Sequence, residues 1–113
     1  MWNTITTQLP VGDMAETQRW FREVLDFEIT YTSGSGFGAV RCGQSEIFLE
    51  RADPPWASVC CCVRVDDVDF LYALYRERDV KVVSVIEDKS WRMREFTIED
   101  PNGHRFRIGR SLR

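Results

Sequence analysis

The sequence predicts an α+β fold made of two similar modules, each with one strand, one helix and then three strands. The first observation is a short internal repeat: Val11-Gly12-Asp13 joins a strand to a helix in the first half, and Val65-Asp66-Asp67 does so in the second. The second is that an apolar stripe at helical spacing and then alternating strands follow each junction. A repeat of about fifty residues in this order predicts a curved mixed sheet with helices on its outer face and a concave ligand cleft opposite.

The length of 113 residues fits one domain with a modest core, and the composition is that of a globular protein. We expect the single domain to span 1–113, with module one at about 1–51, a linker at about 52–57 and module two at about 58–113. The boundary is placed at Pro54-Pro55, since two successive prolines cannot continue a strand.

The first module begins with a strand over 4–10 and a helix from Met14 to about Leu25. Asp13 is a suitable N-cap, and Glu16 three residues later completes a pair that resembles a capping box. The apolar stripe of this helix is interpreted as core. Three strands follow, over 27–32, 37–42 and 46–50.

The second module repeats this order with a strand over 58–65, a helix capped by Asp66 or Asp67, and a strand over 81–86. It closes with a hairpin around Asp100-Pro101-Asn102-Gly103, where proline presets φ and Asn-Gly tolerates a positive φ. The apolar face of this hairpin carries Phe96, Ile98, Phe106 and Ile108. The polar face carries Glu95, Thr97, Glu99, Arg105 and Arg107.

The charge and the cysteine content limit the classes of partner and the cellular location that we expect. The net charge of -3 gives no footprint for nucleic acid, because basic residues are scattered among nearly as many carboxylates. No apolar run reaches membrane-spanning length and no secretion signal is visible, so we expect no membrane partner. Cys42 and the consecutive Cys60, Cys61 and Cys62 fit neither a disulfide framework nor a zinc site. We interpret them as reduced, half-buried strand residues, which favours a cytoplasmic location.

Several short stretches carry a family resemblance: LPVGDM (9–14), WFREVLDF (20–27) and EDPNG (99–103). In this order and spacing they resemble the vicinal oxygen chelate superfamily, which comprises glyoxalase I, bleomycin-resistance proteins, extradiol dioxygenases and fosfomycin-resistance enzymes. Three further stretches are similar to the bleomycin-resistance subgroup: FGAVR (37–41), IFL (47–49) and WRMREF (91–96). The resemblance implies paired βαβββ modules, a homodimer and a ligand cleft lined by aromatic residues.

Metal-dependent members of that superfamily carry ligands at four positions, which match Thr6, Phe48 or Glu50, Cys60 and Arg107 here. A guanidinium is permanently charged and cannot coordinate a cation, and metal sites need three or more protein donors. We therefore expect no metal, no cofactor and no catalytic residue of the family kind. The one histidine, His104, is interpreted as a surface turn residue.

The strand faces opposite the helix-facing residues, with nearby loop ends, supply the expected ligand-binding set. Its members are Tyr31, Phe37, Phe48, Glu50, Trp56, Cys60, Cys62, Trp91, Glu95 and Arg107. Aromatic walls with a few polar groups suit a planar, amphiphilic organic molecule. Arg107 either clamps a carboxylate or phosphate of that molecule or pairs with Glu95 or Glu99 across the hairpin.

The sequence thus favours a binding protein over an enzyme. Such a protein would be metal-free and would sequester a small, partly aromatic molecule in a cleft of a homodimer. One alternative is an enzyme of the same superfamily. It would be either a metal-dependent lyase, isomerase or dioxygenase with a non-standard site around Glu50, or a metal-free lyase or isomerase. Another is a structural or regulatory dimer without a ligand.

Overall fold

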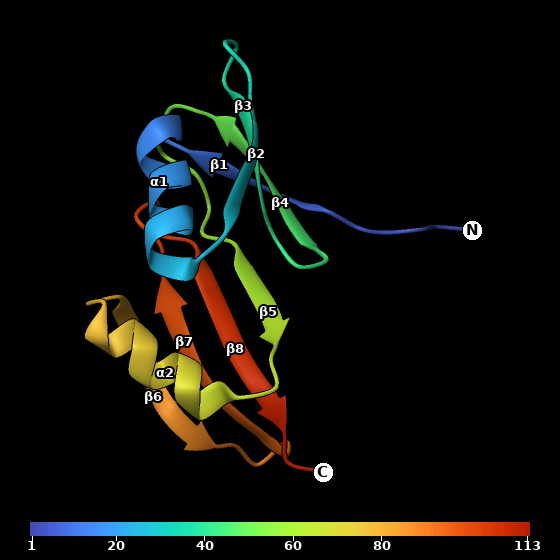
Figure 1. Ribbon diagram of the computed structural model, residues 1–113, viewed down its shortest axis with the longest axis vertical. Helices are drawn as coiled ribbons and strands as arrows, with labels where there is room; N and C mark the ends of the chain where they lie inside the picture. The colour runs from blue at the N-terminus through green and yellow to red at the C-terminus, as the bar shows by residue number, and fades with distance from the viewer. The chain divides into compact units, whose positions relative to one another are not determined.

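The computed structural model describes residues 1–113 and contains two helices and eight strands (Figure 1). The chain divides into two compact units, Met1–Ala57 and Ser58–Arg113. Each unit contains one strand, one helix and three more strands, so the predicted order of elements is confirmed. The grouping of both units into one domain with a concave cleft stays a prediction.

The first unit holds a four-stranded mixed sheet in the order β1-β4-β3-β2. Its elements are β1 (Thr7–Val11), α1 (Met14–Leu25), β2 (Glu28–Thr32), β3 (Phe37–Cys42) and β4 (Ser45–Arg51). β1 is parallel to β4, and the other neighbours are antiparallel. The helix α1 packs on β2, β3 and β4, and it covers one face of the sheet (Figure 1). The other face carries no helix.

The second unit repeats this arrangement in the order β5-β8-β7-β6. Its elements are β5 (Cys60–Arg64), α2 (Val68–Glu77), β6 (Lys81–Asp88), β7 (Met93–Glu99) and β8 (Arg105–Ser111). β5 is parallel to β8, as β1 is to β4, and α2 packs on β6, β7 and β8. The weak sequence echo between the two halves is therefore a duplication of topology. Neither helix is long and apolar enough to cross a membrane.

The strand boundaries differ from the predicted ones by a few residues. β1 begins at Thr7 rather than at residue 4, because its pairing with β4 starts at Thr7 opposite Ile47. β5 begins at Cys60 rather than at residue 58, and β6 extends two residues beyond the predicted range, to Asp88. Pro54 and Pro55 lie between β4 and β5, in a segment that belongs to neither strand.

Both helices begin at an aspartate that caps the first turn. Asp13 Oδ1 accepts the backbone N–H of Glu16 at 2.9 Å, and Asp67 Oδ1 accepts that of Phe70 at 3.1 Å. Of the two residues proposed for the second cap, Asp67 is therefore the one that acts. Each such cap stabilises a helix by about 1 kcal/mol, since it satisfies a backbone donor that has no partner in the helix.

Gly38 lets α1 approach the first sheet closely. A Cβ at this position would lie 2.6 Å from the Met14 sulfur and 2.8 Å from Gln18 Nε2. Gln18 is buried, and its amide donates to the Tyr31 carbonyl at 2.8 Å and accepts from Thr32 Oγ1 at 3.0 Å. These two bonds satisfy a buried polar group and tie α1 to β2.

The turn between β7 and β8 is a buried, hydrogen-bonded node. Asp100 Oδ1 accepts the backbone N–H groups of Asn102 at 2.9 Å and His104 at 2.8 Å. The ring of His104 in turn accepts the backbone N–H of Val59 on Nδ1 at 3.1 Å. The interpretation of His104 as a surface residue is wrong, because its exposed fraction is 0% and its ring ties the approach to β5 onto the hairpin. Gly103 has the positive φ, +85°, expected at this turn.

The burial of Asp100 in this turn predicts how the stability of the protein depends on pH. Burial raises the pKa of Asp100 above its ordinary value, against the lowering effect of the hydrogen bonds from His104 and Asn102. The folded state then holds the proton more tightly than the unfolded chain. The contribution of Asp100 to the free energy of unfolding therefore falls as the pH rises from the ordinary value of 3.8 through the raised value.

We expect Asp100→Asn, which keeps the accepting oxygen, to lose this dependence. Urea unfolding of both proteins at a series of pH values measures the difference in unfolding free energy, wild type minus variant. That difference should decrease with increasing pH; a difference that is flat or that increases contradicts the assignment.

Candidate ligand-binding faces and pocket

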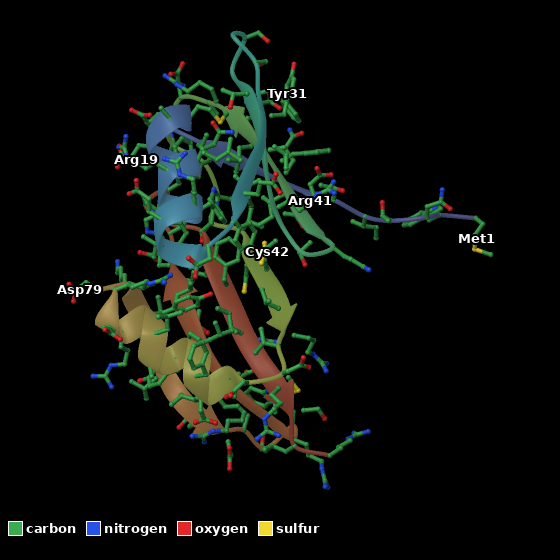
Figure 2. The ribbon with its side chains drawn as sticks, in the orientation of Figure 1. Met1, Arg19, Tyr31, Arg41, Cys42 and Asp79 are labelled. Carbon is green, nitrogen blue, oxygen red and sulfur yellow. The ribbon has the colours of Figure 1, made fainter.

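The candidate residues of the first unit lie on the sheet face that turns away from α1. Successive residues of a strand point to opposite faces, so the buried Ile47 and Leu49 pack on the helix side while Phe48 and Glu50 point the other way. Figure 2 shows the side chain of Tyr31 on the side of this sheet away from α1. This helix-free face carries the candidate ligand-binding residues of the first unit.

Three aromatic side chains form a row on this face. The ring centroids of Tyr31 and Phe37 are 6.1 Å apart, and those of Phe37 and Phe48 are 5.2 Å apart. Beside the row, Gln8 Nε2 donates to Glu50 Oε2 at 2.5 Å. The structure thus brings together four of the ten predicted site residues in the first unit.

A pocket of about 380 Å³ opens on the helix-free face of the second sheet. Four predicted site residues line it: Cys62, Trp91, Glu95 and Arg107. The remaining lining residues are Val63, Arg64, Arg92, Met93, Ser111 and Arg113. All ten belong to the second unit, so this pocket is complete within one half of the chain.

Glu95 is a buried carboxylate in the wall of this pocket, with 4% of its surface exposed. It pairs in register with Gly109 of β8, where a Cβ would lie 2.9 Å from the Glu95 Cβ and 3.0 Å from the Met93 Cε. The absence of a side chain at Gly109 therefore makes the room that Glu95 occupies. The polar face of this hairpin does not simply meet water, because one of its carboxylates is enclosed by the sheet.

Arg107 faces Glu95 across the hairpin at a distance longer than a hydrogen bond. Its Nε lies 3.7 Å from Glu95 Oε1, which is an ion pair without hydrogen-bond geometry. The other carboxylate proposed as its partner, Glu99, pairs instead with Lys81 at 2.6 Å and with Arg105 at 3.4 Å. These two cations, Lys81 foremost, hold the pKa of Glu99 below its ordinary value. The side chain of Arg107 stays 47% exposed, which leaves it accessible from the pocket.

The turn between β6 and β7 supplies one rim of the pocket. The backbone N–H of Lys89 donates to the Met93 carbonyl at 2.7 Å and closes the turn. Trp91 is 56% exposed, and the Lys89 ammonium lies 5.9 Å from its ring centroid. Arg92 has a φ of 66°, in the left-handed region that residues other than glycine rarely adopt. Sequence reasoning missed Arg92, because nothing in the residue pattern marks a left-handed turn at an arginine.

Two predicted site residues lie outside both groups. Cys60 shares a face of β5 with Cys62 but does not line the pocket, and Trp56 is half-buried in the segment before β5. The interpretation of all four cysteines as half-buried is right only for Cys61. The thiols of Cys42, Cys60 and Cys62 are exposed, because Cys42 ends its strand and the other two lie on the open face of an edge strand.

Comparison with known proteins identifies the family of this chain. The sequence profile of the Glyoxalase/Bleomycin resistance protein/Dioxygenase superfamily matches residues 4–108. The chain belongs to this superfamily. The resemblance that the LPVGDM and EDPNG stretches carry is thereby confirmed. Among proteins with a curated description, none matches this sequence.

Solved structures of the superfamily fold cover nearly the whole chain. TioX from Micromonospora sp. ML1 is 20% identical, with 98% of this chain and 100% of that chain covered at a TM-score of 0.84. The bleomycin resistance determinant encoded on the transposon Tn5 is 22% identical, with 97% and 98% covered at a TM-score of 0.82. Lactoylglutathione lyase from Agrobacterium tumefaciens is 18% identical, with 96% and 92% covered at a TM-score of 0.81. At these identities the similarity shows the fold alone.

The superfamily includes metal-dependent enzymes, so the donor set of this chain has to be compared with a metal site. Of the four matching positions, the second is either Phe48, which belongs to the aromatic row, or Glu50, which accepts from Gln8. The fourth is Arg107, which pairs with Glu95. No three His, Cys, Asp or Glu side chains converge closely enough to hold a metal ion. A guanidinium donates no lone pair to a cation, and with either residue at the second position the chain lacks the three converging donors of a metal site. The residues present therefore do not fit the metal of the superfamily.

The close contact at Gly109 gives a test of the pocket wall. We expect Gly109→Ala to destabilise the protein by roughly 1–3 kcal/mol, because the new Cβ overpacks the wall against Glu95 and Met93. Thermal unfolding followed by circular dichroism measures the change. Gly34→Ala is the matched control, since nothing lies within 4 Å of a Cβ there. Equal effects of the two substitutions would contradict the tight packing at Gly109.

Proposed function

We propose that this protein is a metal-free binding protein of the glyoxalase/bleomycin-resistance type, which sequesters a small, partly aromatic organic molecule. The observation that carries the proposal is the pocket of about 380 Å³ on the second sheet, with Trp91 at its rim and a buried Glu95 in its wall. Small-molecule sites occupy about 300–1,000 Å³ and combine apolar walls with a few fixed polar groups. Sequestration needs only affinity, so it is compatible with a donor set that does not fit a metal.

The aromatic row of the first unit supports the same ligand class. Tyr31, Phe37 and Phe48 present ring surfaces on a helix-free face, and offset or tilted contacts between aromatic rings contribute about 0.5–1.5 kcal/mol each beyond burial. Glu50, held by Gln8 beside the row, adds one fixed acceptor. A planar molecule with polar substituents matches such a surface.

We also propose that the protein works as a homodimer, with the binding cleft shared by two subunits. The similarity to bleomycin-resistance proteins supports this part of the proposal. Sedimentation velocity on the purified protein should then give twice the mass of one chain at micromolar concentration. A strictly monomeric protein that still binds its ligand would remove the dimer from the proposal and leave sequestration in place.

The binding proposal predicts a measurable affinity for planar aromatic compounds. Isothermal titration with a panel that contains bleomycin and simpler bicyclic aromatics should give saturable binding to at least one class. Trp91→Ala should weaken that binding roughly tenfold, since an aromatic wall that is lost costs about 1.4 kcal/mol. Phe70→Ala is the control, because Phe70 is 62% exposed, similar to Trp91, but lies on α2 and does not line the pocket. No binding across the panel would count decisively against sequestration.

The alternative within the superfamily is a metal-dependent lyase, isomerase or dioxygenase with a non-standard site. It predicts that the purified protein carries a transition metal in stoichiometric amount. We expect elemental analysis of the protein, expressed without an affinity tag, to find zinc, nickel, manganese and iron far below one equivalent. One equivalent of any of them, lost together with activity on chelation, would favour the enzyme.

A further inference from the structure

We infer that the pocket of the second unit selects ligands that carry an anionic group, a carboxylate or a phosphate, beside a planar ring. The inference rests on the proposed binding function and names its ligand class. The pocket lining contains four arginines and a single carboxylate, Glu95. The chain as a whole has a net charge of -3, so this concentration of positive charge is local. Even without Arg113, three guanidinium groups face one carboxylate.

Two arginines of the pocket, Arg64 and Arg92, differ from their neighbours in lacking acceptors. On the same sheet face but outside the pocket, Arg105 is neutralised by Glu99 at 3.4 Å. Within the pocket, the side chains of Arg64 and Arg92 form no ion pair or hydrogen bond in this chain. Their donor groups therefore remain available to a ligand. A pocket with unpaired cations attracts an anion, and its partly enclosed walls strengthen that attraction relative to open water.

The positions of these groups suit an oxyanion. Arg107 of β8 lies opposite Cys62 of the parallel strand β5, and Arg64 follows two residues later on the same face of β5. Both side chains therefore leave adjacent strands toward one region of the pocket, and both line it. Guanidinium groups bind carboxylate and phosphate oxygens through two parallel N–H donors, a geometry that lysine does not offer. Glu95 Oε1 lies 3.7 Å from Arg107 Nε without a hydrogen bond, so the N–H donors of Arg107 stay available to an oxyanion.

The planar part of the ligand is assigned to Trp91. Its indole is 56% exposed at the rim and offers a large flat surface next to the arginines. The Lys89 ammonium near this ring is paired with Glu87, so the unpaired positive charge beside Trp91 comes from the arginines. A ring stacked on Trp91 would place an attached carboxylate or phosphate among the guanidinium groups.

Backbone strain at Arg92 is an independent observation. A left-handed conformation is unfavourable for a residue with a side chain, and glycine or asparagine would avoid most of that cost. The turn nevertheless carries an arginine at its strained position, and this arginine lines the pocket. Strained residues cluster at binding sites, where the chemistry of the side chain outweighs the strain.

Four compounds that share one ring system test the inference: 2-naphthoate, 2-naphthyl phosphate, 2-naphthamide and 2-naphthylmethylammonium. We expect isothermal titration to show that at least one anion binds ten times more tightly than the neutral amide, and that the ammonium compound binds most weakly. The comparison of naphthoate with naphthyl phosphate distinguishes the two anion classes. Affinity for the preferred anion should fall when the salt concentration increases from 50 to 500 mM, because part of the attraction is between partly exposed charges.

Two results overturn the inference while leaving the proposed function intact. One is equal affinity for naphthoate, naphthyl phosphate and naphthamide, which would mean that the pocket recognises the ring and not the anionic group. The other is tightest binding of the ammonium compound, which would make Glu95 the recognition group. Binding of none of the four overturns the inference too, whereas the broader aromatic panel decides separately whether the protein sequesters any ligand.

Substitutions locate the effect. Arg64→Gln and Arg92→Asn each remove a charge from the pocket without leaving a buried partner, and asparagine tolerates the left-handed turn. Each should reduce the preference for the anion over the amide several-fold. The matched control is Arg105→Gln, because Arg105 lies two residues from Arg107 on the same strand but outside the pocket. An unchanged preference in both pocket variants, or an equal loss in the control, contradicts the inference.

Discussion

The turn at Asp100 sets the strand register on which the pocket of the second unit depends. Its Oδ1 satisfies two backbone donors of the turn, while Oδ2 is buried without a hydrogen-bond partner. His104 extends the node to β5 through its ring bond to Val59, and Arg105 donates its backbone N–H to the Val59 carbonyl at 2.8 Å. One node thus fixes β8 against both β7 and β5. A shift of one residue in either pairing would turn the pocket residues to the helix side of the sheet.

The two units use one topology for two different surfaces. Each has its first strand parallel to its last, and at corresponding places of this pairing Gln8 faces Phe48 while Cys62 faces Arg107. In the first unit the apolar ring extends an aromatic row, whereas in the second the guanidinium borders a pocket. The duplication therefore supplies the scaffold, and a few side chains on the helix-free faces decide what each surface can bind.

The order of elements and the faces of the strands could be predicted because they depend on local periodicity and caps. The alternation around the EDPNG turn assigns Phe96, Ile98, Phe106 and Ile108 to the core, where the structure has them. Burial of His104 could not be predicted, since it depends on the distant Val59 backbone. The enclosure of Glu95 depends likewise on Gly109 across the hairpin, and the strain at Arg92 on the backbone of the turn. The pocket depends on contacts between paired strands, which the residue pattern along a single strand does not reveal.

Arg107 bears both on whether the protein binds a metal and on which ligand its pocket selects. The family resemblance matches its position to a metal ligand of metal-dependent members, and a guanidinium cannot coordinate a cation. The same group supplies a positive charge of its own, so an oxyanion could be held without a metal. Its 3.7 Å contact with the buried Glu95 keeps that carboxylate from being an isolated charge when the pocket has no ligand. In the proposed complex Arg107 would keep Glu95 on one side and take the anion on the other, since a guanidinium offers five N–H donors and Glu95 takes none of them in a hydrogen bond.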